Sequence, residues 1–521
     1  MTKEPIMLLN RIAMFLLMIM VFLTGFPYCL RLDIPSFLSL ISHILSDSDN
    51  SNNNNSYSDN SNNNNSYSDN SNNNNSDSGN SNNNNSGSSG NTFTPAIGVL
   101  DTSFNSPNGF IIQPIGSGND YGQSLAIQPD GKILLGGYCR GVSNNDFCIT
   151  RFNPNGTLDT TFRSSGKVIQ PIGSGHDFGQ SLAIQPDGKI LLGGHCCINN
   201  NRYSFSIARF NSDGISDGTL DTSFGDSGKV IQGIYTTQGN QTTQTQATGQ
   251  SLAIQRDGKI LLGGRCLIIM GFNEFCIARF NPNGTLDTTF GSPNGYIIQS
   301  LYPSEDWGYS LAIQPDDGKI LLGGSCINPN NENRYEFCIA RFNSDGISDG
   351  TLDTSFNSSG KVRQAIGSGD DWGQSLVILP DGKILLGGHC HNGSNFDFCI
   401  ARFNPNGTLD TTFGTFGTSG KVILDINTSD DKGYSLAIQP DGKILLGGHC
   451  HNGSNFDFCI ARFNPNGTLD TTFGTGGKVI QPIGSGDDHG YSLAIQPDGK
   501  ILLGGYCHNG SNYDFCIARF K

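Results

Sequence analysis

Asp441-Gly-Lys-Ile-Leu-Leu-Gly-Gly448 is one of seven identical copies of an eight-residue segment in this chain. The copies start at residues 130, 187, 257, 317, 381, 441 and 498, so that 57 to 70 residues separate one start from the next. A repeat of this length indicates a tandem array, in which each copy belongs to one supersecondary unit that packs against its neighbours. We therefore expect one large repeat domain.

The residues on either side of the segment predict four strands per unit. In the sixth copy, short apolar segments of strand length occupy residues 421–426, 434–439, 443–450 and 458–463. Pro440-Asp-Gly442 separates the second segment from the third, and this combination is typical of a tight turn. The run Ile444-Leu-Leu446 is continuously apolar, as expected for a strand that neighbouring sheets cover on both faces.

The two ends of the array predict a closed ring. The array opens with a single strand, 110–115, and ends with the three other strands of a unit, between Tyr491 and Phe520. Pairing these fragments would complete a blade and remove the exposed sheet edges. The predicted fold class is therefore all-β, a seven-bladed β-propeller of four-stranded blades closed by the N- and C-terminal strands. A linear β-solenoid is the alternative.

The residues before the array predict export. Residues 1–30 contain an apolar stretch after two basic residues, which is typical of a signal peptide or a short membrane anchor. A short apolar segment follows at 31–45, and an Asn/Ser-rich linker at 46–91 is expected to be disordered. The propeller itself is assigned to 92–521. The expected location is secreted or at the cell surface, where the N-terminal segment could serve as a membrane tether.

The repeat unit also resembles a known family. It combines Leu-Asp-Thr-Thr-Phe-Gly, Gly-Lys-Val, Gln-Pro-Asp-Gly-Lys-Ile-Leu-Leu-Gly-Gly and Phe-Cys-Ile-Ala-Arg-Phe-Asn-Pro-Asn-Gly between about residues 98 and 521. This pattern is similar to the delta-60 repeat of bacterial β-propeller proteins. The resemblance implies a propeller that is secreted or surface-exposed. Because those proteins are mostly of unassigned activity, it implies no catalytic residues.

Cysteines recur in pairs on either side of the turn between the last two strands of a unit. Their spacing varies while both members persist, so we expect cross-strand disulfides in an exported protein. The second copy departs from the rule, with Ser206 in place of the second cysteine. Reduced thiols, or zinc bound by His389-Cys-His391 with Cys399 and by the same set at 449–459, are the alternatives. The six predicted pairs are Cys139 with Cys148, Cys266 with Cys276, Cys326 with Cys338, Cys390 with Cys399, Cys450 with Cys459 and Cys507 with Cys516.

An acidic residue enters the expected innermost strand of six copies, usually after Gly-Ser-Gly. These carboxylates would ring one mouth of the central channel, where they could hold calcium, a cation that prefers oxygen ligands. The alternative is that each one accepts hydrogen bonds from its own turn. The third copy lacks the acid. The predicted set is Asp120, Asp177, Asp306, Asp371, Asp431 and Asp488.

Arg402 and Asp410 have counterparts in all seven copies, and we interpret both as structural, paired inside or between blades. Seven identical sites do not suit one active centre. The chain carries 31 Lys and Arg against 45 Asp and Glu, a formal net charge of −14, so a nucleic acid partner is not expected.

These observations favour a monomeric binding or interaction scaffold whose ligand is a protein or a glycan. The near-identity of the copies favours binding over catalysis, and Trp307 and Trp372 could stack on a sugar. No catalytic residues are assigned. The alternative is an enzyme that acts on a glycan or small molecule at the channel mouth, with Asp371, Asp488 and His489 as the residues to test.

Overall fold

The computed structural model describes residues 97–521, except 199–201, 239–240 and 415–418. The predicted signal or anchor segment, the segment 31–45 and the Asn/Ser-rich linker lie outside the described residues. Within the described part of the chain, no helix is long and apolar enough to cross a membrane.

Seven four-stranded antiparallel sheets form the blades, which are numbered here in chain order. Blade 1 contains β2 (Asp120–Ile127), β3 (Ile133–Arg140), β4 (Asn145–Phe152) and β5 (Lys167–Gln170). Blade 2 contains β6 (Asp177–Ile184), β7 (Ile190–Ile198), β8 (Arg202–Phe210) and β9 (Lys229–Gln232). Blade 3 contains β12 (Gln246–Ile254), β13 (Ile260–Leu267), β14 (Asn273–Phe280) and β15 (Tyr296–Gln299). Blade 4 contains β16 (Asp306–Ile313), β17 (Ile320–Asn328), β18 (Arg334–Phe342) and β19 (Lys361–Gln364).

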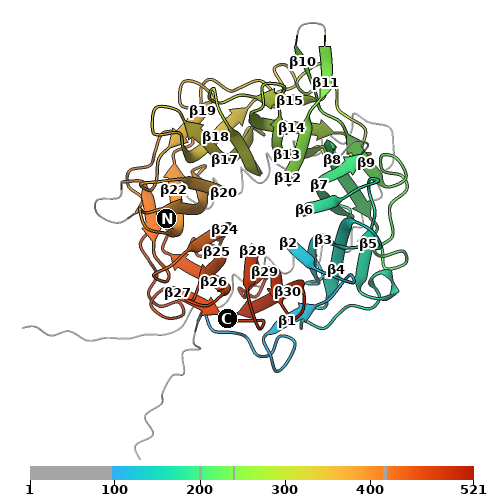
Figure 1. Ribbon diagram of the computed structural model, residues 1–521, viewed down its shortest axis with the longest axis vertical. Helices are drawn as coiled ribbons and strands as arrows, with labels where there is room; N and C mark the ends of the chain where they lie inside the picture. Colours follow the sequence, from blue (N-terminus) through green and yellow to red (C-terminus); the bar gives the residue numbers. More distant parts are fainter. Residues whose placement is uncertain (1–96, 199–201, 239–240, 415–418) are drawn as a thin grey trace, which may run out of the picture. The chain divides into compact units, whose positions relative to one another are not determined.

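Blade 5 contains β20 (Asp371–Ile378), β21 (Ile384–His391), β22 (Phe396–Phe403) and β23 (Lys421–Leu424). Blade 6 contains β24 (Asp431–Ile438), β25 (Ile444–His451), β26 (Phe456–Phe463) and β27 (Lys478–Gln481). Blade 7 contains β28 (Asp488–Ile495), β29 (Ile501–His508), β30 (Tyr513–Phe520) and, from the start of the array, β1 (Phe110–Gln113). A short 3₁₀ helix, η1 (Phe162–Ser164), follows blade 1's third strand. An extra hairpin of β10 (Tyr235–Gln238) and β11 (Gln241–Gln244) projects outward from the ring (Figure 1).

The predicted closure is confirmed. β1 pairs antiparallel with β30, with Phe110 opposite Ala518, so the first strand of the array completes the last blade. The seven blades surround one central axis (Figure 1). One detail differs from the expectation. The sequence grouped residues 421–426 with the three strands that follow them. In the structure, β23 is instead the outermost strand of blade 5, because it pairs with β22 and not with the strands of blade 6.

Neighbouring blades pack through apolar side chains. Between blades 5 and 6, Leu385 and Ile400 of one sheet meet Leu436 and Leu446 of the next, and all four side chains are buried. The blades also approach closely near the axis, where a Cβ on Gly433 would lie 2.6 Å from the Gly388 carbonyl oxygen. Glycine is needed there because no side chain fits between the two backbones.

A ring of serine hydroxyls links the innermost strands. The hydroxyl of Ser375 in blade 5 accepts a hydrogen bond, 3.0 Å long, from the backbone N–H of Leu436 in blade 6. The same bond occurs at all seven blade junctions. The serines are Ser124, Ser181, Ser251, Ser310, Ser375, Ser435 and Ser492.

The sevenfold arginine and aspartate are paired as expected. Nε of Arg402 lies 2.8 Å from Asp410 Oδ2, and the guanidinium lies over the Phe413 ring at 4.5 Å. Nη1 of the same arginine donates to the Pro465 carbonyl in blade 6, at 2.6 Å. Burial works to raise the pKa of Asp410, but Thr412, Lys383 and Arg402 outweigh it and hold the pKa below its usual value. The seven pairs are Arg151 with Asp159, Arg209 with Asp221, Arg279 with Asp287, Arg341 with Asp353, Arg402 with Asp410, Arg462 with Asp470 and Arg519 with Asp101.

Replacing Arg402 with Ala is expected to lower the free energy of unfolding by about 3 kcal/mol, because it leaves Asp410 buried without its arginine. Urea denaturation followed by tryptophan fluorescence measures the change. Arg140→Ala is the matched control, since Arg140 is exposed at the end of β3. Equal midpoints for the two variants would contradict a structural role for the buried arginine.

Candidate functional site

The six predicted ring aspartates each begin the innermost strand of a blade and are fully buried. Asp431 accepts hydrogen bonds from the backbone N–H groups of Ile426 at 2.7 Å and Asn427 at 3.0 Å. The same loop-to-carboxylate bonding occurs at Asp120, Asp177, Asp306, Asp371 and Asp488. These aspartates therefore hold the loop that enters each blade, and calcium binding by the set stays a prediction.

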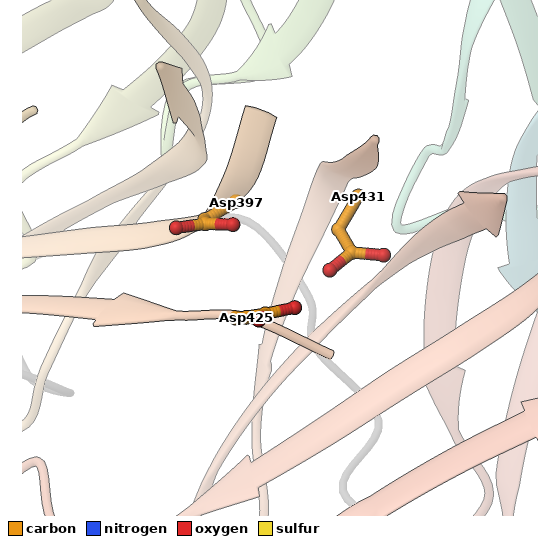
Figure 2. A group of neighbouring side chains, drawn as sticks. All are labelled: Asp397, Asp425 and Asp431. Atoms are coloured by element: carbon orange, nitrogen blue, oxygen red, sulfur yellow. The ribbon is translucent and has the colours of Figure 1, made fainter. Parts of the chain in front are cut away.

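Each of these aspartates also faces a second carboxylate, which the sequence analysis did not identify. It comes from the third strand of the preceding blade, as Asp397 does for Asp431 (Figure 2). Burial, with repulsion from Asp425 and Asp397, raises the pKa of Asp431 to about 7 against its backbone hydrogen bonds. The six pairs are Asp514 with Asp120, Asp146 with Asp177, Glu274 with Asp306, Glu336 with Asp371, Asp397 with Asp431 and Asp457 with Asp488.

The junction between blades 2 and 3 lacks both members of the pair. Ser204 stands where the other blades have Asp or Glu, and Ala247 stands where they have the ring aspartate. The loss of both together was visible in the sequence and is the signal that could have revealed the pairing. It indicates that the two carboxylates act as one unit.

The six predicted disulfides are confirmed, and each joins the second and third strands of its blade, with Cα atoms 5.6 to 5.9 Å apart. The bonded pairs are Cys139 with Cys148, Cys266 with Cys276, Cys326 with Cys338, Cys390 with Cys399, Cys450 with Cys459 and Cys507 with Cys516. In blade 2, where Ser206 replaces the second cysteine, Cys196 is a buried thiol. The reduced-thiol alternative therefore does not hold for these twelve cysteines.

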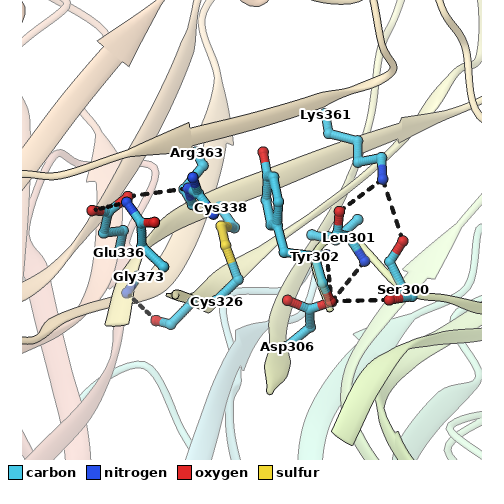
Figure 3. Close-up of a disulfide and its surroundings, with 12 residues drawn as sticks. Ser300, Leu301, Tyr302, Asp306, Cys326, Glu336, Cys338, Lys361, Arg363 and Gly373 are labelled. Carbon is cyan, nitrogen blue, oxygen red and sulfur yellow. Dashed lines mark hydrogen bonds and ion pairs between the residues drawn. A yellow bond between two sulfur atoms is a disulfide. The ribbon is translucent and has the colours of Figure 1, made fainter. Parts of the chain in front are cut away.

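The disulfide of blade 4 lies between the carboxylates of two junctions. Cys326 and Cys338 are placed beside Asp306, which binds its loop amides, and beside Glu336, which pairs with Arg363 at 3.3 Å (Figure 3). The disulfide thus fixes the hairpin of β17 and β18, which carries Glu336, close to Asp306 at the start of β16.

The disulfides occupy the thiols that the zinc alternative requires. His389 and His391 are two residues apart on β21, so they lie on the face opposite Cys390. Neither the bonding of the cysteines nor the direction of the imidazoles supports a zinc site there. Strand alternation alone could have excluded this alternative.

In most blades, one aromatic or histidine side chain directly follows the ring aspartate, and another directly precedes the cysteine of the second strand. We call this set the aromatic belt. Its innermost-strand members are half-buried, as are the three tyrosines at the β-bulges of blades 4, 6 and 7. The belt consists of Tyr121, Phe178, Trp307, Tyr309, Trp372, Tyr434, His489 and Tyr491 from the innermost strands, and of Tyr138, His195, His389, His449 and Tyr506 from the second strands.

Ring contacts connect the belt around much of the central axis. From blade 7 to blade 2, each ring lies 4.9 to 5.1 Å from the next, in the order His489, Tyr506, Tyr121, Tyr138, Phe178 and His195. On the other side, His389, Tyr434, His449 and His489 form a second run with spacings of 4.5 to 5.5 Å. Because its members come from the same part of each blade, the start of the innermost strand and the facing end of the second strand, the belt lies at one end of the axis.

The two tryptophans form the segment of the belt between blades 4 and 5. Their rings meet edge to face at 5.6 Å, and the Arg265 guanidinium lies 4.0 Å from the centre of the Trp307 ring. Nε1 of Trp307 donates to a carboxylate oxygen of Glu305 at 3.1 Å. Both indoles are thus fixed by neighbours while remaining partly exposed.

The belt histidines are neutral at physiological pH. Burial lowers the pKa of His389 to about 4, against the opposing effect of the Gly433 carbonyl oxygen 3.3 Å from Nδ1. Burial has the same effect on His195 and His489, whose pKa values are also lowered to about 4. The belt is therefore uncharged, with its second-strand histidines buried, and Lys432 and Arg265 replace aromatic residues in two blades.

Comparison with known proteins identifies the fold family. Seven segments of the chain match the family described as a domain of unknown function (DUF5122) beta-propeller, at residues 128–162, 185–214, 255–290, 316–346, 379–413, 439–473 and 496–521. The chain belongs to this β-propeller family. The resemblance to delta-60 repeat propellers is consistent with it. No curated protein matches the chain.

Several solved structures are similar to this DUF5122 propeller at low identity. A protein of unknown function from Dyadobacter fermentans is 13% identical, with a TM-score of 0.41, covering 79% of this chain and 97% of that one. The polysaccharide lyase Uly1 is 13% identical, with a TM-score of 0.44, covering 77% and 90%. Sqt1 from Chaetomium thermophilum is 14% identical, with a TM-score of 0.40, covering 79% and 98%. At such identities their activities are not carried over to this chain.

Replacing His389 with Phe is expected to reduce the loss of stability on acidification. The unfolded chain binds a proton at this histidine near pH 6.5, whereas the folded chain does so only near pH 4. The wild type should therefore lose about 2 kcal/mol more than the variant between pH 7 and pH 5. Urea denaturation at both pH values measures the difference. The same loss in both proteins would show that the imidazole is charged in the fold.

Proposed function

We propose that this chain is an exported or surface-tethered, monomeric scaffold that binds a glycan or protein ligand through the aromatic belt. The observation that carries this proposal is where the near-identical blades differ from one another. The pair of Arg402 with Asp410, the linking serine Ser375 and the close-approach glycine Gly433 have counterparts in all seven blades and hold the ring together. The belt position after the ring aspartate instead carries Tyr, Phe, Thr, Trp, Trp, Lys and His in turn.

The belt residues differ from blade to blade while the structural residues recur, and this difference supports recognition of a single ligand. A ring of seven equal positions would present the same chemistry in every direction. The belt instead presents a tryptophan pair on one side and a tyrosine and histidine cluster on another. Aromatic residues fixed by their neighbours lose little conformational entropy on binding, and they are enriched where binding energy is concentrated.

The tryptophan pair favours a glycan as the first ligand class to test. Flat indole faces suit the apolar faces of sugar rings, and Glu305 and Asp370 supply hydrogen-bond acceptors beside them. The six disulfides are those of a protein that folds in an oxidising environment, which supports export. The acidic net charge of −14 supports a partner other than nucleic acid.

Replacing both Trp307 and Trp372 with Ala is expected to weaken glycan binding at least tenfold, because it removes both indole faces. An array of defined oligosaccharides would first identify the bound sugar, and isothermal titration calorimetry would then give Kd for the wild type and the variant. Near-ultraviolet circular dichroism checks that the variant is folded.

The matched control is Ile347→Ser, since Ile347 is 95% exposed on a loop outside the belt. It should bind the sugar as the wild type does. Equal Kd values for the wild type and the double tryptophan variant would remove the belt as the binding surface. A wild type that binds no sugar but does bind a protein from the cell surface would assign the belt to the other ligand class.

An enzyme remains the second candidate because of the cluster at blades 6 and 7. The rings of His449 and His489 are 4.5 Å apart, and Nδ1 of each is buried without a hydrogen-bond partner among the described residues. The hydroxyls of Tyr491 and Tyr506 lie 3.2 Å apart beside them. A neutral imidazole and a phenol are suitable for acid-base chemistry. By contrast, Asp371 and Asp488 are fully buried and bound to loop amides.

The scaffold proposal predicts no turnover when the purified chain is incubated with a panel of polysaccharides and the release of reducing ends is measured. Turnover that His489→Asn lowers by about 100-fold or more would identify an enzyme instead. Ile347→Ser is again the control, because it lies outside the belt and leaves the cluster untouched.

A further inference from the structure

Among the described residues, the junction between blades 5 and 6 differs from the others because three carboxylates approach one another closely there. Asp397 comes from β22, Asp425 from the connection after β23, and Asp431 from the start of β24. One oxygen of each carboxylate lies within 4.8 Å of the other two. Figure 2 shows the three carboxylates turned toward one another. Three negative charges this close repel one another unless a cation or protons neutralise them.

Two of the carboxylate oxygens at this junction point to a missing ligand. Asp397 is 3% exposed and Asp431 is fully buried. Oδ1 of each has no hydrogen-bond partner among the described residues, although the other oxygen of each is bonded. A buried carboxylate oxygen without a partner is costly, so these two oxygens are suited to direct coordination of a cation.

Two other junctions solve the same electrostatic problem differently, whereas Glu274, Asp306 and Asp457 keep unpartnered carboxylate oxygens like those of Asp397 and Asp431. Between blades 4 and 5, Arg363 lies 3.3 Å from Glu336 and supplies a positive charge. Between blades 2 and 3, both carboxylates are absent. The position of Asp425 is occupied by an uncharged residue in every other blade connection, namely Pro114, Pro171, Gly233, Ser300, Ala365 and Pro482. Among the described residues, only here do three carboxylates come within 4.8 Å of one another, and the third is the acid at this position of the connection.

In the described part of the chain, no salt bridge joins a basic side chain to any of these three carboxylates. Lys478 and His391 act on Asp397 electrostatically. However, the Lys478 ammonium donates to the backbone carbonyls of Asp425 at 2.6 Å and Ile426 at 3.4 Å.

We propose that Asp397, Asp425 and Asp431 bind one divalent cation of the calcium type at the junction of blades 5 and 6. The donors are all oxygens, which suits a hard cation and not zinc. Asp425 is exposed, so the ion can reach the two buried carboxylates from solvent. Water would complete the six to eight oxygen ligands that calcium takes. The site joins two blades through a bound ion.

The test uses the full chain with its disulfides intact, treated with EDTA and titrated with CaCl2 by isothermal titration calorimetry. The wild type should bind one calcium ion per chain, and its melting temperature should rise with CaCl2. Asp425→Pro restores the residue found in three other connections and should weaken binding at least tenfold. Asp425→Ala, matching Ala365, is the second variant in case proline disturbs the loop.

The chain also offers a gain-of-function control. Pro482→Asp adds a third acid to the pair of Asp457 and Asp488, and it should raise the stoichiometry from one ion to two. Unchanged calcium binding by Asp425→Pro and Asp425→Ala would overturn the proposal, as would a wild type that binds no calcium at millimolar CaCl2. MgCl2 binding as tightly as CaCl2 would overturn the calcium assignment.

Discussion

The arginine near the end of the third strand joins its own blade to the next one in six of the seven blades, and the closed ring depends on this contact. Arg402 binds Asp410 and stacks on Phe413 within its blade, and it reaches the Pro465 carbonyl of the following blade. A buried charge is tolerated only when it is paired and hydrogen-bonded. A blade packed in the wrong register would leave this guanidinium without partners, so the arginine favours a single arrangement of the sheets.

The same contact operates across the closure of the ring. Arg519, two residues from the end of the chain, pairs with Asp101 at the start of the array and donates to the Pro154 carbonyl in blade 1. β1 adds backbone pairing with β30 of blade 7. The first and last parts of the array are therefore joined by an ion pair, a strand pairing and a contact to blade 1. Together these interactions complete the seventh blade and close the described ring.

The repeats predicted the fold well because identical residues in seven copies must satisfy one packing scheme. The closure, the disulfides and the pairing of Arg402 with Asp410 followed from which residues recur and where the array is cut. The carboxylate pairs could not be predicted in this way. Their members, such as Asp397 and Asp431, lie in different blades and are not neighbours in sequence. A β-bulge between Gly433 and Ser435 also shifts the alternation of β24. A regular strand would have placed Asp431 on the wrong face relative to Leu436.

Each disulfide closes a hairpin within one blade, with its cysteines only 9 to 12 residues apart in sequence. Twelve cysteines in nearly identical surroundings could pair wrongly in a great many ways. A short loop closes at far lower entropic cost than one that spans two blades. Local pairing therefore lets each hairpin find its own partner cysteine as the thiols oxidise, so the similarity of the blades does not become a source of scrambled isomers.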